Sequence, residues 1–302
     1  MAVGDALGLP WEFKGKGVVR ASWDGSMVGY GTWGMPPGTW SDDTGQALAL
    51  ADALARHGLS LEAFGRSLLA WLRGEYMPDG AVFDIGVTTS KALMALAEGV
   101  PPTRSGVNSP SCGSLMRAYP LATYTACLPL DEALEAAHRF SAVTHAHPLA
   151  EMACGLYTAA VRALLAGLNP RDAVDAATHV LGSRYARSPR YGPWVREFNY
   201  LLKGVEGLEK EPEEGSCYAP ETLYGALWSL THSRSFREAL EKAVGLGGDT
   251  DTLGAVAGSL AGTHYGEDSI PREWVGSLRR RDLLEEVLER FVNAVERACS
   301  GE

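Results

Sequence analysis

The chain has 302 residues, of which 46% are hydrophobic and 21% charged, and its formal net charge is −10 at pH 7. This composition is that of a globular protein long enough to bury a sizeable core. The acidic balance argues against a general nucleic-acid or membrane-surface binder, because few Lys and Arg side chains are spare to meet phosphates. It is compatible with an anionic substrate held by a few donors or by metal ions.

Apolar residues at helical spacing run through most of the chain, and several of these segments stop at Gly or before Pro. Segment 18–32 is Gly-rich with a few Val and Trp, which predicts a short hairpin or a loop, and 103–110 and 206–220 read as loops. The motif-like segment 4–8 stands so near residue 1 that either its helix is short or the natural start lies upstream. The predicted helices are 43–56, 61–72, 86–97, 130–141, 150–168, 171–181, 222–231, 235–245, 250–263 and 282–299.

These elements predict an all-α fold, since no segment has the pattern of a convincing strand. No change of composition marks a domain border, so residues 1–302 are expected to form a single compact domain. Many short helices with Gly and Ala at contact positions favour close, angled helix packing over a long coiled bundle.

The cysteines predict no disulfide framework, because their number is odd, their positions are scattered and no C-x-x-C pair occurs. No stretch approaches the roughly 18 apolar residues of a membrane-spanning helix. With no recognisable signal peptide, the expected compartment is the reducing cytoplasm. The cysteines are Cys112, Cys127, Cys154, Cys217 and Cys299.

Two acidic segments precede predicted helices. Segment 37–44 contains Ser41, Asp42 and Asp43, and segment 247–252 contains Asp249, Asp251 and Thr252. One interpretation is helix capping, because Ser, Thr and Asp at a helix start accept backbone N–H bonds. Capping explains one acidic residue per helix better than two neighbouring carboxylates, which repel each other.

The other interpretation is a shared metal centre. Carboxylates and hydroxyls are the oxygen ligands that hard cations such as Mg²⁺ prefer, and neither segment holds the His or Cys typical of zinc sites. Four carboxylates from two helix starts would offset the charge of two divalent cations about 4 Å apart. The Gly247-Gly248 pair allows a sharp turn before the second set.

The order of these motifs resembles the ADP-ribosylglycohydrolase family, especially the bacterial type that acts on arginine-linked ADP-ribose of dinitrogenase reductase. Any one match is weak, but six in the family's order over nearly the whole chain are specific. One departure is Ser111-Cys112, where the family often has Gly-Asn. The matches are 4–8 with Glu12; 37–44; 83–86 with Thr88 and Thr89; 113–117; Thr144 and His145 with His147 and Pro148; and 247–255 with Tyr265 and Gly266.

The resemblance implies an all-helical glycohydrolase with two divalent cations, Mg²⁺ or Mn²⁺. It implies catalytic roles for Glu12 and for Asp84, which falls where arginine-type members carry a catalytic Asp. From the residues alone, Asp84 is equally explained as a cap before Gly86, and Glu12 as a surface carboxylate. The implied metal ligands are Ser41, Asp42, Asp43, Asp249, Asp251 and Thr252.

A glycosidic bond breaks through an oxocarbenium-like state, which a carboxylate assists as general acid or base. Gly113 and Ser114 are candidates to donate hydrogen bonds to the phosphates, and Arg117 is either a phosphate partner or a structural ion-pair partner. His145 is a candidate contact of the ribose or phosphate, and Tyr218 is a candidate to stack on the base.

The expected partners are an ADP-ribosylated protein or small molecule, with ADP-ribose as product; the charge disfavours nucleic acid, and no membrane partner is expected. Arginine-linked ADP-ribose is the preferred substrate. Alternatives are a serine-, nucleic-acid- or small-molecule-linked substrate, a non-catalytic ADP-ribose-binding member, and a two-metal phosphohydrolase.

Overall fold

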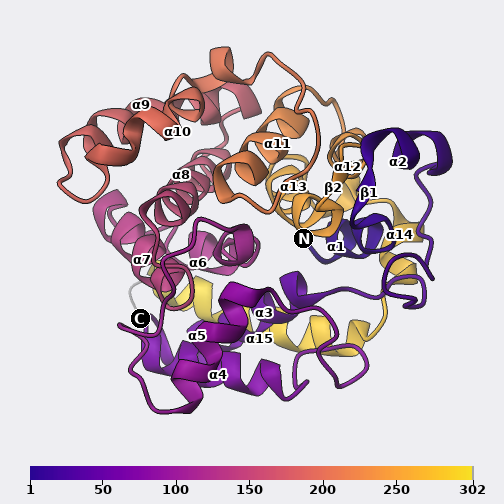
Figure 1. Ribbon diagram of the computed structural model, residues 1–302, viewed down its shortest axis with the longest axis horizontal. Helices are drawn as coiled ribbons and strands as arrows, with labels where there is room; N and C mark the ends of the chain where they lie inside the picture. Colours follow the sequence, from indigo (N-terminus) through magenta and orange to yellow (C-terminus); the bar gives the residue numbers. More distant parts are fainter. Residues whose placement is uncertain (301–302) are drawn as a thin grey trace.

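The computed structural model describes residues 1–300 and consists almost entirely of helices (Figure 1). A two-stranded antiparallel sheet pairs β1 (Lys14–Gly15) with β2 (Gly247–Gly248). The α-helices are α1 Ala2–Gly8, α2 Lys16–Ser22, α3 Asp42–His57, α4 Leu61–Leu72, α5 Val87–Ala97, α6 Tyr119–Tyr124, α7 Leu130–Ala142, α8 Pro148–Leu165, α9 Pro170–Arg187, α10 Val195–Leu202, α11 Ala219–Thr231, α12 Phe236–Val244, α13 Thr250–Tyr265, α14 Arg272–Ser277 and α15 Arg281–Ser300. Short 3₁₀ turns are η1 Leu9–Trp11, η2 Cys112–Ser114, η3 Gly192–Trp194, η4 Gly204–Leu208 and η5 Glu267–Ser269.

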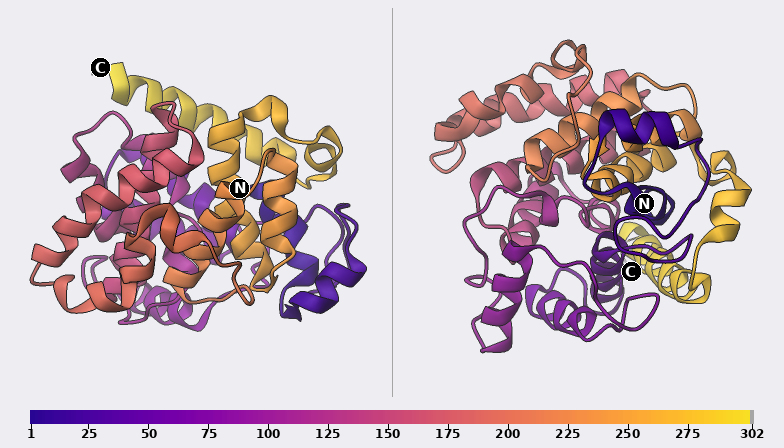
Figure 2. Two further views of the ribbon diagram at one scale, coloured as in Figure 1. Left: turned by 90° about the horizontal axis from the view of Figure 1, so that it is seen from above. Right: turned by 45° about the vertical axis from the view of Figure 1, so that its right-hand side comes forward.

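Three long, largely buried helices organise the molecule. Helices α8 and α13 lie in one hydrophobic core with α9, α11 and α12, whereas α3 lies in a second core with α4 and α15. Helices α9 and α10 form one side of the molecule and α4 and α5 the opposite side (Figures 1 and 2). The N-terminal ends of α3 and α13 meet between the two cores.

Glycine allows α1 to pack directly on α13. A Cβ on Gly4 would lie 1.9 Å from the carbonyl oxygen of Gly254, and one on Gly8 would lie 2.2 Å from that of Thr250. The two backbones therefore approach more closely than side chains would permit. The prediction of close helix packing through small residues is confirmed here, and the contact fixes the position of Asp5.

The all-α fold is confirmed, and each predicted helix is present, 61–72 with the predicted ends and the others with at least one end shifted. The largest shifts are at α8, which starts at Pro148 because His147 Nδ1 caps it, and at α9, which runs to Arg187. The prediction for segment 18–32 is wrong in its first part, where α2 forms. Val19 of α2 is fully buried in the core, and this packing outweighs the low helix propensity of the neighbouring glycines.

The loop predicted at 206–220 is interrupted by η4 and by the start of α11.

No disulfide framework was predicted, and the structure has one disulfide beside three free cysteines. Cys127 and Cys299 are bonded, and they lie 172 positions apart in sequence. Such a pair has no spacing signal, because only the docking of α15 brings its two ends together. The cysteine pattern therefore no longer supports a reducing compartment. Within residues 1–300, no helix is long and apolar enough to cross a membrane.

Candidate functional site

The first turn of α3 is held by Asp5 of α1. The Asp5 carboxylate accepts the backbone N–H groups of Ser41 (2.9 Å) and Thr44 (3.0 Å) and the Thr44 hydroxyl (2.6 Å). Ser41 is the N-cap residue, and its hydroxyl accepts the N–H of Asp43. Because Asp5 and Ser41 satisfy the helix start, the carboxylates of Asp42 and Asp43 are not needed as caps.

The first turn of α13 follows a tight Gly turn. Gly247 and Gly248 both have positive φ (72° and 70°), and β2 pairs there with β1 just after Glu12. A Cβ on Gly248 would lie 2.1 Å from the carbonyl oxygen of Gly215. Asp249 is the N-cap residue of α13, but its side chain makes no capping hydrogen bond. The turn thus presents Asp249 and Asp251 without using the Asp249 side chain to cap the helix.

The two acidic segments converge on one buried cluster. The Asp43 carboxylate accepts hydroxyl hydrogen bonds from Thr252 (3.4 Å) and Ser41 (3.2 Å). Carboxylate oxygens of Glu12, Asp249 and Asp251 lie within 4.8 Å of one another. All six predicted ligand residues are buried. Segments more than two hundred residues apart therefore share one site.

This cluster lacks the positive charge and the donors that its carboxylates require. Asp43 Oδ1 and Asp251 Oδ2 are buried and accept no hydrogen bond. Burial, with the charges of neighbouring carboxylates, raises the pKa of Asp42, Asp43 and Asp251 well above their usual range. Unpaired buried carboxylate oxygens are costly. The donor set fits hard divalent cations, because such ions supply both the charge and the missing ligand contacts.

Glu12 and Asp84 lie beside the cluster. Burial and the Asp84 charge raise the pKa of Glu12 to about 8, and burial with the Asp249 charge raises that of Asp84 to about 7. Glu12 is 5% exposed, so it is not a surface carboxylate. The alternative role of Asp84 as a cap is also unsupported, since Gly86 is the N-cap residue of α5 and no side chain caps the helix.

Trp33 is a site residue that sequence reasoning missed. Its indole N–H donates to Glu12 Oε2, and its ring packs against Phe83, with centroids 5.8 Å apart. Phe13, which is 63% exposed, packs on the other side at 6.4 Å. The only sequence signal was a Trp in a Gly-rich loop. The three rings form an aromatic rim next to Glu12 and Asp84.

The predicted substrate-binding residues 113–117 and 145 form one network. The buried Arg117 guanidinium donates to the Gly113 carbonyl (2.8 Å), to the Gln46 side chain (2.7 Å) and to Thr144 (2.5 Å). Gln46 in turn donates to Asp42 (3.0 Å). These contacts favour a structural role for Arg117 over a direct phosphate contact, although its hydrogen-bond partners are neutral groups and not the expected ion-pair partner. The network links the η2 loop to the start of α3.

The side chains of His145 and Ser114 are buried, as is that of Arg117. His145 Nδ1 bonds the Thr144 hydroxyl (2.7 Å), and burial with the Arg117 charge lowers the His145 pKa to about 3, so its ring is neutral. A Cβ on Gly113 would lie 2.8 Å from this ring. The Ser114 hydroxyl accepts from Ser141 (2.8 Å), which directs it into the core.

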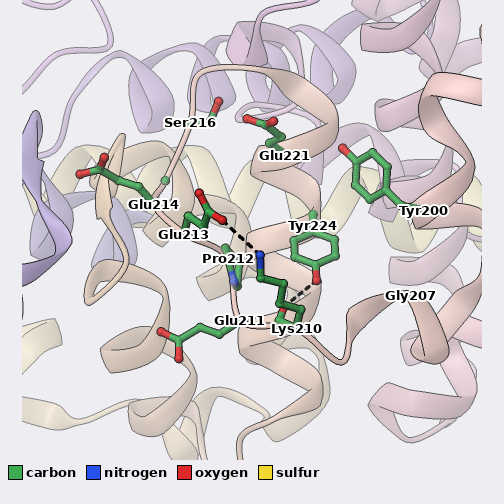
Figure 3. Close-up of a pocket in the computed structure, with 11 residues that line it drawn as sticks. Tyr200, Gly207, Lys210, Glu211, Pro212, Glu213, Glu214, Ser216, Glu221 and Tyr224 are labelled. Carbon is green, nitrogen blue, oxygen red and sulfur yellow. Dashed lines mark hydrogen bonds and ion pairs between the residues drawn. The ribbon is translucent and has the colours of Figure 1, made fainter.

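Tyr218 lies at the edge of the site, half-buried, and its hydroxyl donates to Glu197 (2.5 Å). A separate hollow of about 500 Å³ is lined by loop residues 210–216 (Figure 3). Lys210, Glu213, Glu221, Tyr200 and Tyr224 are among its lining residues, but none of the predicted site residues lines it. The hollow and the acidic cluster are thus distinct.

The sequence matches the ADP-ribosylglycohydrolase family over residues 1–301. The chain belongs to that family. A solved structure described as an ADP-ribosylglycohydrolase-related protein complex aligns with a TM-score of 0.79 and 33% identity, covering 99% of this chain and 94% of that one. The all-helical ADP-ribosylglycohydrolase fold is therefore shared throughout.

Curated relatives carry glycohydrolase names. The chain is 32% identical to ADP-ribosylarginine hydrolase Tri1 of Pseudomonas putida (strain GB-1), over 91% of this chain and 71% of the relative. It is 30% identical to ADP-ribosyl-[dinitrogen reductase] glycohydrolase of Rhodospirillum rubrum, over 98% and 92%. As a member of the ADP-ribosylglycohydrolase family, the chain is a glycohydrolase.

Proposed function

We propose that the chain, as one domain over residues 1–302, is a metal-dependent hydrolase that releases ADP-ribose from arginine-modified protein. The observation that carries this proposal is the convergence of two helix starts on buried carboxylate oxygens without partners. The names of the relatives, which include ADP-ribosylarginine hydrolase, support the arginine linkage. An ADP-ribosylated small molecule is a related substrate class. A nucleic-acid or membrane partner is not proposed, and cytoplasmic location remains an expectation.

We assign two divalent cations, Mg²⁺ or Mn²⁺, to oxygen atoms of the two helix starts. When bound, such cations hold substrate hydroxyls and lower the pKa of a water molecule. Asp43 Oδ1 and Asp251 Oδ2 are the atoms most in need of a cation, because they have no other partner. The assigned ligand residues are Ser41, Asp42, Asp43, Asp249, Asp251 and Thr252.

Asp84 and Glu12 supply the proton chemistry in this proposal. Asp84, with a pKa raised to about 7, holds or releases a proton near neutral pH and pairs with a guanidinium leaving group. Glu12 is oriented by the Trp33 N–H, and with divalent cations bound beside it, which favour its ionised form, it would accept the proton of the attacking water. Asp84 thus acts on the leaving group and Glu12 on the attacking water.

The η2 loop and its neighbours would hold the rest of ADP-ribose. Gly113 lets the backbone pass close to His145, so the loop offers backbone N–H groups to a diphosphate. Arg117 and Ser114 hold this loop through their hydrogen bonds, and the neutral His145 ring, bonded to the Thr144 hydroxyl, packs against Gly113. Tyr218, half-buried at the edge, is the proposed base-stacking side chain.

The proposal is tested by incubating arginine-ADP-ribosylated protein with the enzyme, with and without Mg²⁺ or Mn²⁺, beside an Asp249→Ala/Asp251→Ala variant. We expect free ADP-ribose only with metal and only from the unchanged protein. Release of AMP or inorganic phosphate instead would indicate a phosphohydrolase. Metal binding without any release would exclude the arginine substrate, and serine- and nucleic-acid-linked ADP-ribose would then be compared.

A further inference from the structure

Two thiols lie next to a proposed ligand of the metal centre. Cys112 Sγ is 3.4 Å from Asp249 Oδ2, and Cys112 Sγ, Cys217 Sγ and an Asp249 carboxylate oxygen all lie within 4.8 Å of one another. The three residues come from η2, from the loop before α11 and from the N-cap of α13. Together they offer two sulfur atoms and one carboxylate oxygen to a metal ion.

The backbone around the two thiols is fixed by hydrogen bonds. The Cys112 N–H donates to the Cys217 carbonyl (2.8 Å), which places the two residues side by side. Beyond Cys217, the Tyr218 N–H donates to the Ser216 hydroxyl (3.1 Å). On the other side, the Gly215 N–H donates to the Gly247 carbonyl (3.1 Å), which ties this loop to the turn that carries Asp249. The cluster is therefore held from three elements.

The spacing of the group is compatible with a tetrahedral site for a thiophilic cation, since all three ligand atoms lie within 4.8 Å of one another. With metal–sulfur bonds of about 2.3 Å and metal–oxygen bonds of about 2.0 Å, the ligand atoms lie about 3.8 Å (sulfur–sulfur) and about 3.5 Å (sulfur–oxygen) apart. The Cys112–Asp249 distance of 3.4 Å agrees with the latter value. Cys112 is buried and Cys217 is exposed, so an ion can enter from the Cys217 side, and solvent water would be its fourth ligand.

We propose that Cys112, Cys217 and Asp249 form a second metal site, which takes a soft divalent cation such as Zn²⁺ or Cd²⁺. On binding, each thiol releases its proton to solvent and donates a sulfur lone pair to the ion, while Asp249 donates a carboxylate oxygen. Loss of two protons offsets the two positive charges gained, so the net charge of the group is unchanged. The neighbouring centre has only oxygen donors, so it binds such a soft ion less well than the two thiolates do.

Asp249 is common to this site and to the hard-cation centre of the proposed function. Filling the thiol site therefore withdraws a ligand from that centre, and the two ions weaken each other's binding by the same factor. This coupling rests on the proposed function, whereas the binding of a soft cation by the two thiols does not.

The direct test is a titration of the metal-free protein with Cd²⁺ under nitrogen and without reductant, so that the Cys127–Cys299 bond stays intact. Sulfur-to-cadmium charge transfer gives an ultraviolet band that oxygen ligands do not give. We expect one equivalent of Cd²⁺ to produce the band in the unchanged protein. Changes outside the first ligand shell already cost about 10–100-fold in affinity, so Cys112→Ser and Cys217→Ser should each cost at least as much.

Cys154→Ala is the matched control, because Cys154 is a third free, buried thiol whose Sγ contacts Ser114 instead (3.6 Å). It should keep the band and the Cd²⁺ affinity. Cys217 is exposed, so Cys217→Ser tests the site with little risk to folding. A band that survives in Cys217→Ser, no band in the unchanged protein, or a Cys112–Cys217 disulfide found by mass spectrometry would each overturn the proposal.

The coupling is read from Mn²⁺ release, followed by the spin resonance of free Mn²⁺. Cd²⁺ should displace Mn²⁺ from the unchanged protein at one equivalent, but not from Cys217→Ser. If Mn²⁺ binds and ADP-ribose is released while Cd²⁺ gives no thiolate band, only the second site is rejected. If the band appears but no Mn²⁺ binds, the proposed function fails and the thiol site stands.

Discussion

The Thr252 hydroxyl lies 3.4 Å from Asp43 Oδ2, although 209 residues separate the two in sequence. This contact joins the first turns of α13 and α3 and places the two acidic segments in one cluster. The carboxylates repel one another there and raise each other's pKa values. Metal binding, proton binding and stability are consequently coupled in this protein.

Asp84→Asn removes the proposed proton-transfer group and keeps the size of the side chain. We expect hydrolysis of arginine-linked ADP-ribose to fall by about 10²–10⁴-fold, the usual contribution of a positioned acid or base. Mn²⁺ affinity should change little. The control is Asp79→Asn, since Asp79 is exposed and pairs with Arg279 (2.7 Å). A full rate in Asp84→Asn would remove Asp84 from the mechanism.

Trp33→Phe keeps an aromatic ring against Phe83 but removes the donor to Glu12. A hydrogen bond to a charged group contributes about 1.5–3 kcal/mol, so kcat/KM should fall by roughly 10–100-fold. The thermal midpoint should stay near that of the unchanged protein. Trp23→Phe is the matched control, because the Trp23 N–H donates to the Ser26 carbonyl away from the site (2.8 Å). Equal rates in both variants would contradict the positioning role of Trp33.

The metal-free protein should lose stability as the pH rises through the neutral range. The pKa values of Glu12 and Asp84 are raised to about 8 and about 7, and those of Asp42, Asp43 and Asp251 are also raised. Groups with raised folded-state pKa values stabilise the fold below their unfolded-state pKa, and this stabilisation disappears as the pH passes the folded-state value.

Divalent cations should restore the stability that the metal-free protein loses when these carboxyl groups lose their protons. Melting of the protein with a chelator, and then with Mn²⁺, is measured at about pH 5.5 and about pH 8. We expect the rise in melting temperature on adding Mn²⁺ to be larger at the higher pH, and smaller in the Asp249→Ala/Asp251→Ala variant. Equal rises at both pH values would show that protons and metal do not compete for these carboxylates.

Gly254→Ala should destabilise the whole site by separating α1 from α13. The added Cβ would lie 2.3 Å from the Gly4 carbonyl oxygen, so backbone must shift, at a cost of about 1–3 kcal/mol. Gly262→Ala, in the same helix, meets only a Phe236 ring atom at 3.8 Å and should be neutral or stabilising by up to about 1 kcal/mol. Urea denaturation compares the two; similar losses would argue against the tight α1–α13 contact.

The double variant Cys127→Ala/Cys299→Ala tests the disulfide that the sequence did not predict. A bond that closes so long a loop restricts the unfolded chain, and its removal should lower the free energy of unfolding by about 2–5 kcal/mol. Thiol titration of the unchanged, unfolded protein should detect only Cys112, Cys154 and Cys217. Five reactive thiols would show that the bond does not form.

What the sequence determined by itself is local. Helical periodicity in segments such as 43–56 and 250–263, and Gly at their ends, predict helices because both signals act within a few residues along the chain. The acidic pairs at Asp42-Asp43 and Asp249-Asp251 stood out for the same reason: oxygen ligands for a hard cation are recognisable as residue types. A helix start at Asp43, one residue after the observed start at Asp42, and the helix start at Thr250 were therefore predicted without any structure.

Only the tertiary structure decided which of these groups meet. That Asp5 holds the first turn of α3, that Trp33 orients Glu12, and that Cys217 approaches Asp249 depend on the packing of α1, α3, α11 and α13. Each contact joins residues distant in the chain, and no local pattern encodes the distance between them. Whether a carboxylate is solvated or left without a partner, as Asp43 Oδ1 and Asp251 Oδ2 are, follows from burial, which is a property of the assembled cores.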